Sequence, residues 1–205
     1  CYSDDVAPGQ GLRVAFLRAP YAHARLTHLD CTAARALDGV RLVASQADLD
    51  ADNVGEIKCQ YCPPLISGGK MEMITKPPMV RDINRYAGDI IAMVVADTQD
   101  IADAALELIE ADYETFQAVT DVYAAMDDAA PRLYDCYANN IAFEWGAGDA
   151  DAADKAMQAA IAEGRKIVEI DVVNNRIVIN SLETRPLVAV PDPEAGTLEV
   201  WCGTQ

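Results

Sequence analysis

Arg18-Ala-Pro-Tyr-Ala-His-Ala-Arg25 combines a proline break with an alternation of alanine and histidine, and it lies between two segments of strand-like pattern. Leu12–Ala19 and Ala22–Asp30 each carry apolar residues at nearly every second position. Because successive side chains of a strand point to opposite faces, this alternation predicts two strands. The octapeptide is therefore predicted to join them, and the rest of the chain is interpreted outward from this pair.

Short elements of both kinds follow. Thr32–Leu37 is rich in alanine and is followed by Gly39, which predicts a short helix capped by its own first residue. Val40–Ala44 predicts another strand, and Ser45 is placed to cap a brief turn after it. Residues 50–79 lose periodicity and gather Cys, Pro, Gly and Met, which indicates an irregular loop.

A strand–helix–strand unit is predicted next. Ile90–Ala96 is wholly apolar and of strand length, which is typical of a buried strand. Asp97-Thr98 can cap a helix over Gln99–Ile109, in which one face is apolar, formed by Ile101, Ala105, Leu108 and Ile109. Glu110–Phe116 alternates again and predicts the second strand.

The remainder begins with Ala118–Pro131, which is rich in Ala and Asp and predicts a connection with a boundary near 127–140. Acidic residues at Asp149–Asp154 suit the start of a helix that Gly164 closes. The connection includes a short predicted helix at Val122–Met126. Beyond the boundary, the pattern predicts a second, sheet-rich part with these elements in order: a strand at Ile141–Trp145, a helix ending near Ala162, an extended segment over Ile167–Asn180, and strands at Leu187–Val190 and Thr197–Cys202.

Composition excludes several classes of function. The chain of 205 residues has a formal charge of -17, which repels nucleic acid and anionic membranes. No apolar run approaches the roughly 20 residues that cross a bilayer, and the acidic N-terminus is unlike a secretory signal. Its six cysteines are scattered rather than spaced as a disulfide framework. We expect a cytoplasmic protein with reduced thiols and no nucleic-acid or membrane partner.

Cys59-Gln-Tyr-Cys62 has a spacing that lets two thiolates meet one metal ion or exchange a disulfide. A structural zinc site needs two further ligands, and His23 and His28 share one strand-like segment without the required spacing. The motif also lacks the helix N-terminus that lowers a thiol pKa. A structural or incidental role is therefore favoured over a metal site.

Other candidate sites have ordinary structural explanations. Gly146-Ala-Gly148 before a helix can cradle a phosphate, but the acidic residues from Asp149 onward repel one, which favours a plain N-cap. His23 lacks a locatable catalytic partner and is interpreted as a packing residue. Asn174-Asn-Arg176 and Ser181–Arg185 concentrate polar groups, and either two polar turns or the wall of a site would account for them.

Taken in order, these pieces resemble the molybdenum-binding large subunit of the xanthine dehydrogenase, aldehyde oxidase and carbon monoxide dehydrogenase family. The resemblance runs nearly end to end, with similar gaps between its pieces. Besides Leu12–Arg25, the matching residues are Tyr2–Val6, Leu37–Val40, Arg85–Ala96, Ile109–Tyr113, Ala118–Asp121, Asn174–Arg176, Leu182–Arg185 and Gly203–Gln205.

The resemblance implies an α+β protein in which residues 1–125 form an α/β hammerhead domain. Residues 126–137 are then a linker, and 138–205 are the N-terminal part of the first molybdopterin-binding domain. In such enzymes molybdenum held by a pterin dithiolene, in some members as a cytosine dinucleotide, hydroxylates a carbon of a small-molecule substrate with water as the oxygen source. Electrons leave through iron–sulfur and FAD subunits or domains, which are the implied partners together with the remainder of the molybdenum subunit.

The resemblance also implies site residues. A glutamine at the place of Gln205 lies beside the molybdenum, where its amide can donate a hydrogen bond, so Gln205 is the predicted cofactor-binding residue. Glu183 and Arg185 match positions near the substrate approach. No catalytic residue and no protein ligand to the metal are predicted in this chain. It departs from the usual Tyr-Val-Gly-Glu-Pro pattern at Ala87, Asp89 and Ile90, so the substrate stays open.

The expected function is that of an N-terminal fragment of a molybdenum hydroxylase large subunit, which supplies scaffold and one edge of the metal pocket. Alone, such a fragment is expected to be inactive and to bind no cofactor stably. An alternative is a naturally split subunit or stand-alone hammerhead module completed by another chain. A further hypothesis is a zinc-binding module that uses Cys59 and Cys62.

Overall fold

The computed structural model describes residues 11–71, 73–137, 139–174, 177, 180–182 and 185–203. They divide into two compact units. One unit consists of residues 12–146, and the other contains Gly11 and the described residues from Ala147 onward. Each unit is described by itself.

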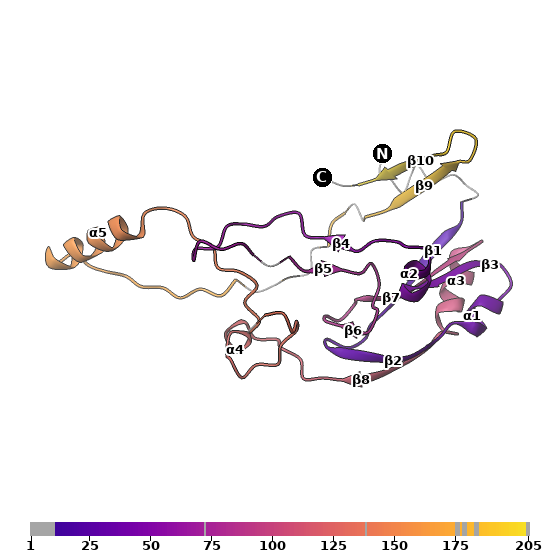
Figure 1. The fold of residues 1–205 in the computed structure, drawn as a ribbon, viewed down its shortest axis with the longest axis horizontal. Helices are drawn as coiled ribbons and strands as arrows, with labels where there is room; N and C mark the ends of the chain where they lie inside the picture. The colour runs from indigo at the N-terminus through magenta and orange to yellow at the C-terminus, as the bar shows by residue number, and fades with distance from the viewer. Residues whose placement is uncertain are drawn as a thin grey trace. The chain divides into compact units, whose positions relative to one another are not determined.

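The first unit contains a three-stranded antiparallel sheet with the order β1-β7-β3. β1 spans Arg13–Arg18, β7 spans Ile90–Ala96 and β3 spans Val40–Ser45. The apolar run predicted as a buried strand is thus the central strand, hydrogen-bonded on both edges (Figure 1). All of its residues are buried or partly buried, because both faces of the sheet are covered there.

Two helices cover one face of this sheet. α1 spans Thr32–Ala36 and α3 spans Gln99–Leu106, and both contribute to a core with the sheet. Gly39 adopts a φ of +85°, and a Cβ there would lie 2.7 Å from the Cδ1 atom of Ile101. The positive φ favours glycine here, because residues with a Cβ are strained in this conformation. The buried residues of this core are Ala15, Cys31, Ala34, Val43, Val94, Ala96, Ala102 and Ala105.

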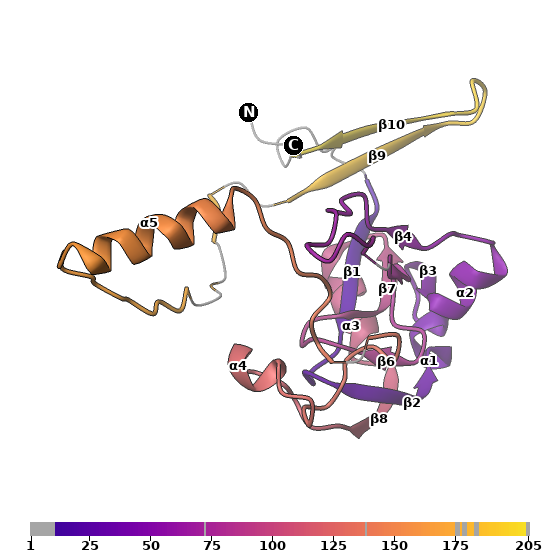
Figure 2. The ribbon, with the colours of Figure 1, turned by 60° about the vertical axis from the view of Figure 1, so that its left-hand side comes forward.

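A second three-stranded sheet has the order β6-β2-β8. β6 spans Ile83–Asn84, β2 spans Ala24–Asp30 and β8 spans Glu110–Thr115; β2 and β8 run side by side in both ribbon views (Figures 1 and 2). A second core forms around Ala19, Val80 and Ile91, with Leu26 and Tyr113 packed against it. Ile91 and Val94 lie on opposite faces of β7, so this strand contributes to both cores.

The loop between β3 and β7 is irregular, as predicted, but it starts with a helix. α2 spans Gln46–Ala51 and has a full capping box between Ser45 and Asp48. Two short strands, β4 (Ile57–Lys58) and β5 (Thr75–Lys76), pair antiparallel within the loop. α4 (Val122–Ala125) follows later in the same unit.

The second unit contains a helix and a β-hairpin. α5 spans Ala150–Ala162, and its N-cap Asp149 accepts a hydrogen bond from the Ala152 N–H group. β9 (Leu187–Asp192) and β10 (Thr197–Cys202) pair antiparallel in continuous register. Nearly all residues of both strands are exposed, so neither face of the hairpin is covered within its own unit.

Several element predictions are wrong in detail. Ile141–Trp145 forms no strand, and neither do the described residues of 167–180, because no neighbouring strand pairs with them. α3 stops at Leu106, since a tight turn must reverse the chain into β8, and Leu108 is exposed rather than on the apolar face. The carboxylate of Asp30, not Thr32, accepts the hydrogen bond at the start of α1. β6 was not predicted at all.

Candidate functional site

The octapeptide Arg18–Arg25 holds the two sheets of the first unit together. The Arg18 guanidinium donates to the Gly88 carbonyl oxygen over 2.9 Å. The backbone of Ala19 exchanges hydrogen bonds with Asp89 and Gly88, and the Asn84 amide donates to the Tyr21 carbonyl oxygen. These contacts link the β1–β2 connection to the start of β7 and to β6, so the segment holds the two sheets together.

His23 behaves as the predicted packing residue. Its side chain is buried, its ring meets the Phe116 ring edge-on at 5.0 Å, and Nδ1 lies 3.4 Å from the Gln117 carbonyl oxygen. No carboxylate or nucleophile is among these contacts. The imidazole therefore holds the end of β8 against β2.

An ion pair with one buried partner, in the same region, has no signal in the sequence pattern. Asp89, with a side chain only 7% exposed, lies 3.0 Å from the Lys76 ammonium, which also donates to the Tyr86 hydroxyl. Burial alone would lower the pKa of Lys76, but its hydrogen bonds to Tyr86 and Asp89 raise it above the usual value. No sequence pattern relates Lys76 to Asp89, since the loop between them has no periodicity.

The glycine turn before α5 is an ordinary N-cap, as interpreted from the sequence. Asp149 and Asp151 place negative charge at the N-terminus of the helix, where an anionic ligand would otherwise bind. Gly148 adopts a φ of +99°, which the turn requires. The turn therefore fits helix capping and not phosphate binding.

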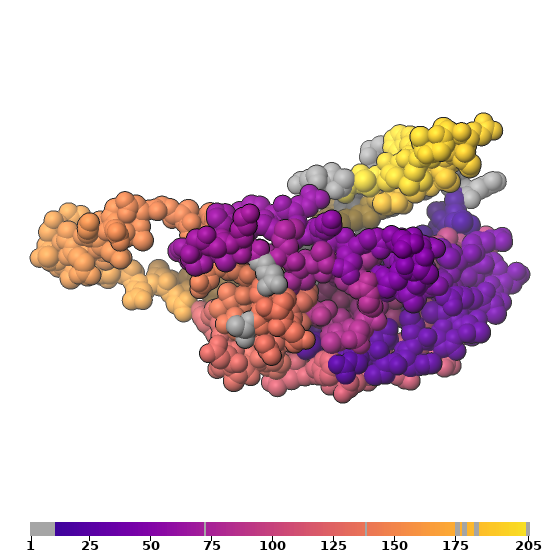
Figure 3. Space-filling view, viewed as in Figure 1, coloured from indigo at the N-terminus to yellow at the C-terminus, as the bar shows by residue number. Residues whose placement is uncertain are grey.

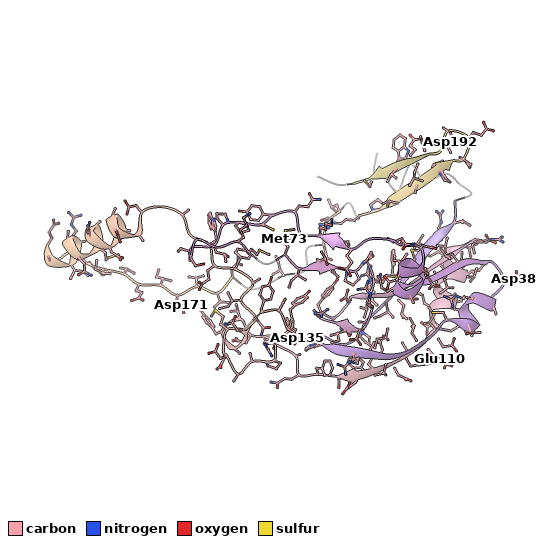
Figure 4. The ribbon with its side chains drawn as sticks, in the orientation of Figure 1. Asp38, Met73, Glu110, Asp135, Asp171 and Asp192 are labelled. Atoms are coloured by element: carbon pink, nitrogen blue, oxygen red, sulfur yellow. The ribbon has the colours of Figure 1, made fainter. Side chains whose placement is uncertain are left out.

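The predicted site residues belong to the hairpin unit. Leu187 pairs with Cys202, so Arg185 and Gly203 flank the same open end of the hairpin, opposite the turn that Asp192 stabilises (Figure 4). Arg185 is exposed, and no salt bridge to it occurs among the described residues. Glu183 and Gln205 lie outside the described residues, as do Asn175, Arg176 and Thr184 of the polar stretches.

Comparison with known proteins decides the family. Residues 1–117 match the family described as the a/b hammerhead domain of aldehyde oxidase and xanthine dehydrogenase. The chain belongs to this family. Residues 133–205 match the molybdopterin cofactor-binding domain, so the hammerhead domain is followed by part of a molybdopterin-binding domain. The predicted family and α+β fold class are therefore confirmed.

Individual members of the hammerhead family show how much of such a protein this chain represents. The carbon monoxide dehydrogenase large chain of Afipia carboxidovorans is 30% identical over 98% of this chain. The nicotine 6-hydroxylase large subunit of Paenarthrobacter nicotinovorans is 26% identical over the whole chain. The crystal structure of quinoline 2-oxidoreductase from Pseudomonas putida 86 superposes with a TM-score of 0.80 at 29% identity, again over the whole chain. In each case the chain spans 24% of the relative's length.

The chain is thus homologous to oxidoreductases of the molybdenum hydroxylase type, several of which are named as a large chain or subunit. Among the described residues, no helix is long and apolar enough to cross a membrane. In the same part of the chain, no group of three or more His, Cys, Asp or Glu side chains is arranged to hold a metal ion.

Proposed function

We propose that this chain supplies the scaffold and one edge of the molybdenum pocket in a molybdenum-dependent hydroxylase, and that it is inactive without the remainder of the large subunit. The hammerhead domain is the scaffold. The edge of the pocket consists of Glu183, Arg185 and Gln205, with Gln205 toward the cofactor and the other two toward the substrate approach.

The observation that supports this assignment is the register of the β9–β10 hairpin. Arg185 and Gly203 flank its open end, Glu183 precedes Arg185 by two residues, and Gln205 follows Gly203 by two. The chain segment before β9 and the one after β10 are distant in sequence, but both begin at the open end of the hairpin. The exposed faces of the hairpin also favour completion by further polypeptide, since a two-stranded hairpin alone is marginally stable.

The chemistry of these side chains suits a pterin cofactor with anionic groups. Arg185 is exposed and has no carboxylate partner among the described residues, so its guanidinium is available to an anion of the cofactor or substrate. The bound cofactor supplies the oxidation chemistry, while the chain orients and hydrogen-bonds it. Iron–sulfur and FAD subunits or domains would be the partners that accept the electrons.

The test is Gln205→Ala in the assembled enzyme. Loss of the amide donor removes a hydrogen bond directed at the metal end of the cofactor, and we expect kcat to fall by about 100-fold. Molybdenum content, measured by elemental analysis, and the circular dichroism spectrum should not change. Gln158→Ala, at an exposed position on α5, is the matched control and should leave kcat unaltered. Equal kcat values for the wild type and Gln205→Ala would refute the role of Gln205.

A further inference from the structure

The sheet β1-β7-β3 has one face packed on helices and a second face of a different kind. Val94 and its cross-strand partners Ala15 and Val43 belong to the core that the sheet forms with α1 and α3. The residues next to them along each strand point to the opposite side, here called the outer face. The outer face consists of two rows of cross-strand partners, Val14–Val95–Leu42 and Phe16–Met93–Ala44, and all six side chains are apolar.

The outer face is accessible at its two edge strands. Val14 is 44% exposed, Phe16 40% and Leu42 49%. Met93 and Val95 of the central strand are partly buried. Single exposed apolar residues are ordinary on a protein surface, but a continuous apolar patch across three neighbouring strands is typical of an interaction surface.

The long irregular loop of the first unit does not close over these edges. Residues 59–76 of this loop pack against residues 133–142, side by side, purple against orange, in Figure 3. An apolar cavity of about 300 Å³ lies between the two segments, and Cys59 and Met71 are among the residues that line it. The Ile66 N–H group also donates to the Glu144 carbonyl oxygen over 3.1 Å. The loop is therefore held by a segment of its own unit, and the edges of the outer face stay exposed.

The chemistry of the outer face indicates which partner covers it. Its six side chains contain no charged or polar group, which suits a permanent interface, since such interfaces resemble a domain core divided in two. A second copy of the chain is disfavoured, because two chains with a formal charge of -17 each repel one another. The chain spans 24% of the length of its relatives, so most of a large subunit lies outside the matched part and is available to pack on this face.

We propose that the outer face is the docking surface for an apolar patch on the remainder of the large subunit. This inference rests on the proposed function and specifies where the rest of the subunit packs on the hammerhead domain. Aliphatic and aromatic side chains of that patch fill the grooves between the two rows. Val14, Phe16 and Leu42 lose the most contact with water on docking, because they are the most exposed members of the face.

Hydroxyl-radical footprinting with mass spectrometry tests this surface in the wild-type protein. The oxidation rates of Phe16 and Leu42 are compared between the chain of 205 residues and the purified large subunit. We expect both rates to fall by at least about 10-fold in the large subunit, because the core of a packed interface excludes water. Leu108, which is 39% exposed in the turn after α3, is the matched control and should keep its rate.

Unchanged rates for Phe16 and Leu42 in the large subunit would overturn the proposal. Protection that appears only after iron–sulfur and FAD subunits are added would also overturn it, because those subunits would then be the partners. Protection in the chain alone, with the mass of a dimer in analytical ultracentrifugation, would assign the face to a second copy instead.

Leu42→Lys provides a second measurement. A charged group in the interface prevents close packing, so Phe16 of this variant should regain at least about half of its oxidation rate in the large subunit. Leu108→Lys, the matched control variant, should leave Phe16 protected. Full protection of Phe16 in Leu42→Lys would contradict a single apolar face.

The kcat of Gln205→Ala separates this proposal from the proposed function. If kcat falls in this variant while the outer face of the enzyme is still oxidised at the rate of the chain alone, only the docking surface is refuted. If the outer face is protected and kcat does not change, only the role of Gln205 is refuted.

Discussion

The Gln46 side chain is buried, with Gln46 only 2% exposed, and both the oxygen and the nitrogen of its amide form hydrogen bonds. Its oxygen accepts the Met79 N–H over 2.9 Å, and its nitrogen donates to Asp50 over 2.8 Å. A buried polar side chain at the start of a helix is stable only because both partners satisfy it. Gln46 therefore holds the end of the irregular loop against α2.

Gln46→Met tests this role at the residue scale. Methionine fills similar space but leaves the buried Met79 N–H without a partner, so we expect a loss of about 1–3 kcal/mol in the free energy of unfolding. Urea denaturation measures this change. Gln99→Met, at an exposed position on α3, should change stability by less than about 0.5 kcal/mol. An equally small effect at Gln46 would show that the amide is dispensable.

At the scale of elements, Arg81 connects α2 to the residue before β4. Its guanidinium donates two hydrogen bonds to Asp50 and one of 2.7 Å to Glu56. The hydrogen bonds from Arg81, followed by the one from Gln46, lower the pKa of Asp50 from 3.8 to about 2. Because the folded-state pKa is depressed, this contribution to stability is complete above about pH 3.8 and is lost as the pH falls through about 2.

Arg81→Gln should raise the pKa of Asp50 toward 3.8, with the Gln46 hydrogen bond keeping it somewhat below that value. Carbon-detected NMR titration of the Asp50 carboxyl carbon measures the shift. Arg41→Gln, which removes an unrelated pair with Asp97, is the control and should leave the Asp50 titration unchanged. An Asp50 pKa that stays near 2 in Arg81→Gln would contradict the assignment.

At the scale of the whole molecule, the position of the domain boundary determines how much of the chain the hammerhead unit requires for its stability. The division proposed from sequence ends this domain at residue 125, whereas the compact unit extends to Gly146. The segment after 125 packs back onto the unit. Arg85 donates to the Leu133 carbonyl oxygen over 2.7 Å and lies 4.3 Å from the centre of the Tyr134 ring, and Ile66 donates to Glu144.

A chain of residues 12–146 should therefore have a higher Tm than one of residues 12–125. The shorter chain loses the Arg85 contacts and one wall of the apolar cavity. Differential scanning calorimetry compares the two, and Arg85→Gln in the longer chain separates the effect of this one residue from that of the whole segment. Equal Tm values would favour the boundary at 125.

Prediction from sequence succeeded where local pattern and burial agree. Ile90–Ala96 was predicted as a buried strand because it is apolar on both faces, and it is the central strand of its sheet. Prediction failed where a segment becomes a strand only if another strand lies beside it to form hydrogen bonds. Ile141–Trp145 has a strand-like pattern but no neighbouring strand, and the two-residue strand β6 forms only because β2 lies beside it.

The sequence by itself determined the family and the order of the main elements, because both depend on residue identity and spacing along the chain. Only the tertiary structure decided that Arg18–Arg25 fastens two sheets, that Lys76 neutralises Asp89, and that Cys59 shares a cavity with Met71. Such contacts join residues that are far apart in sequence. Their closeness follows from the packing of the loop against the sheets, which no local pattern contains.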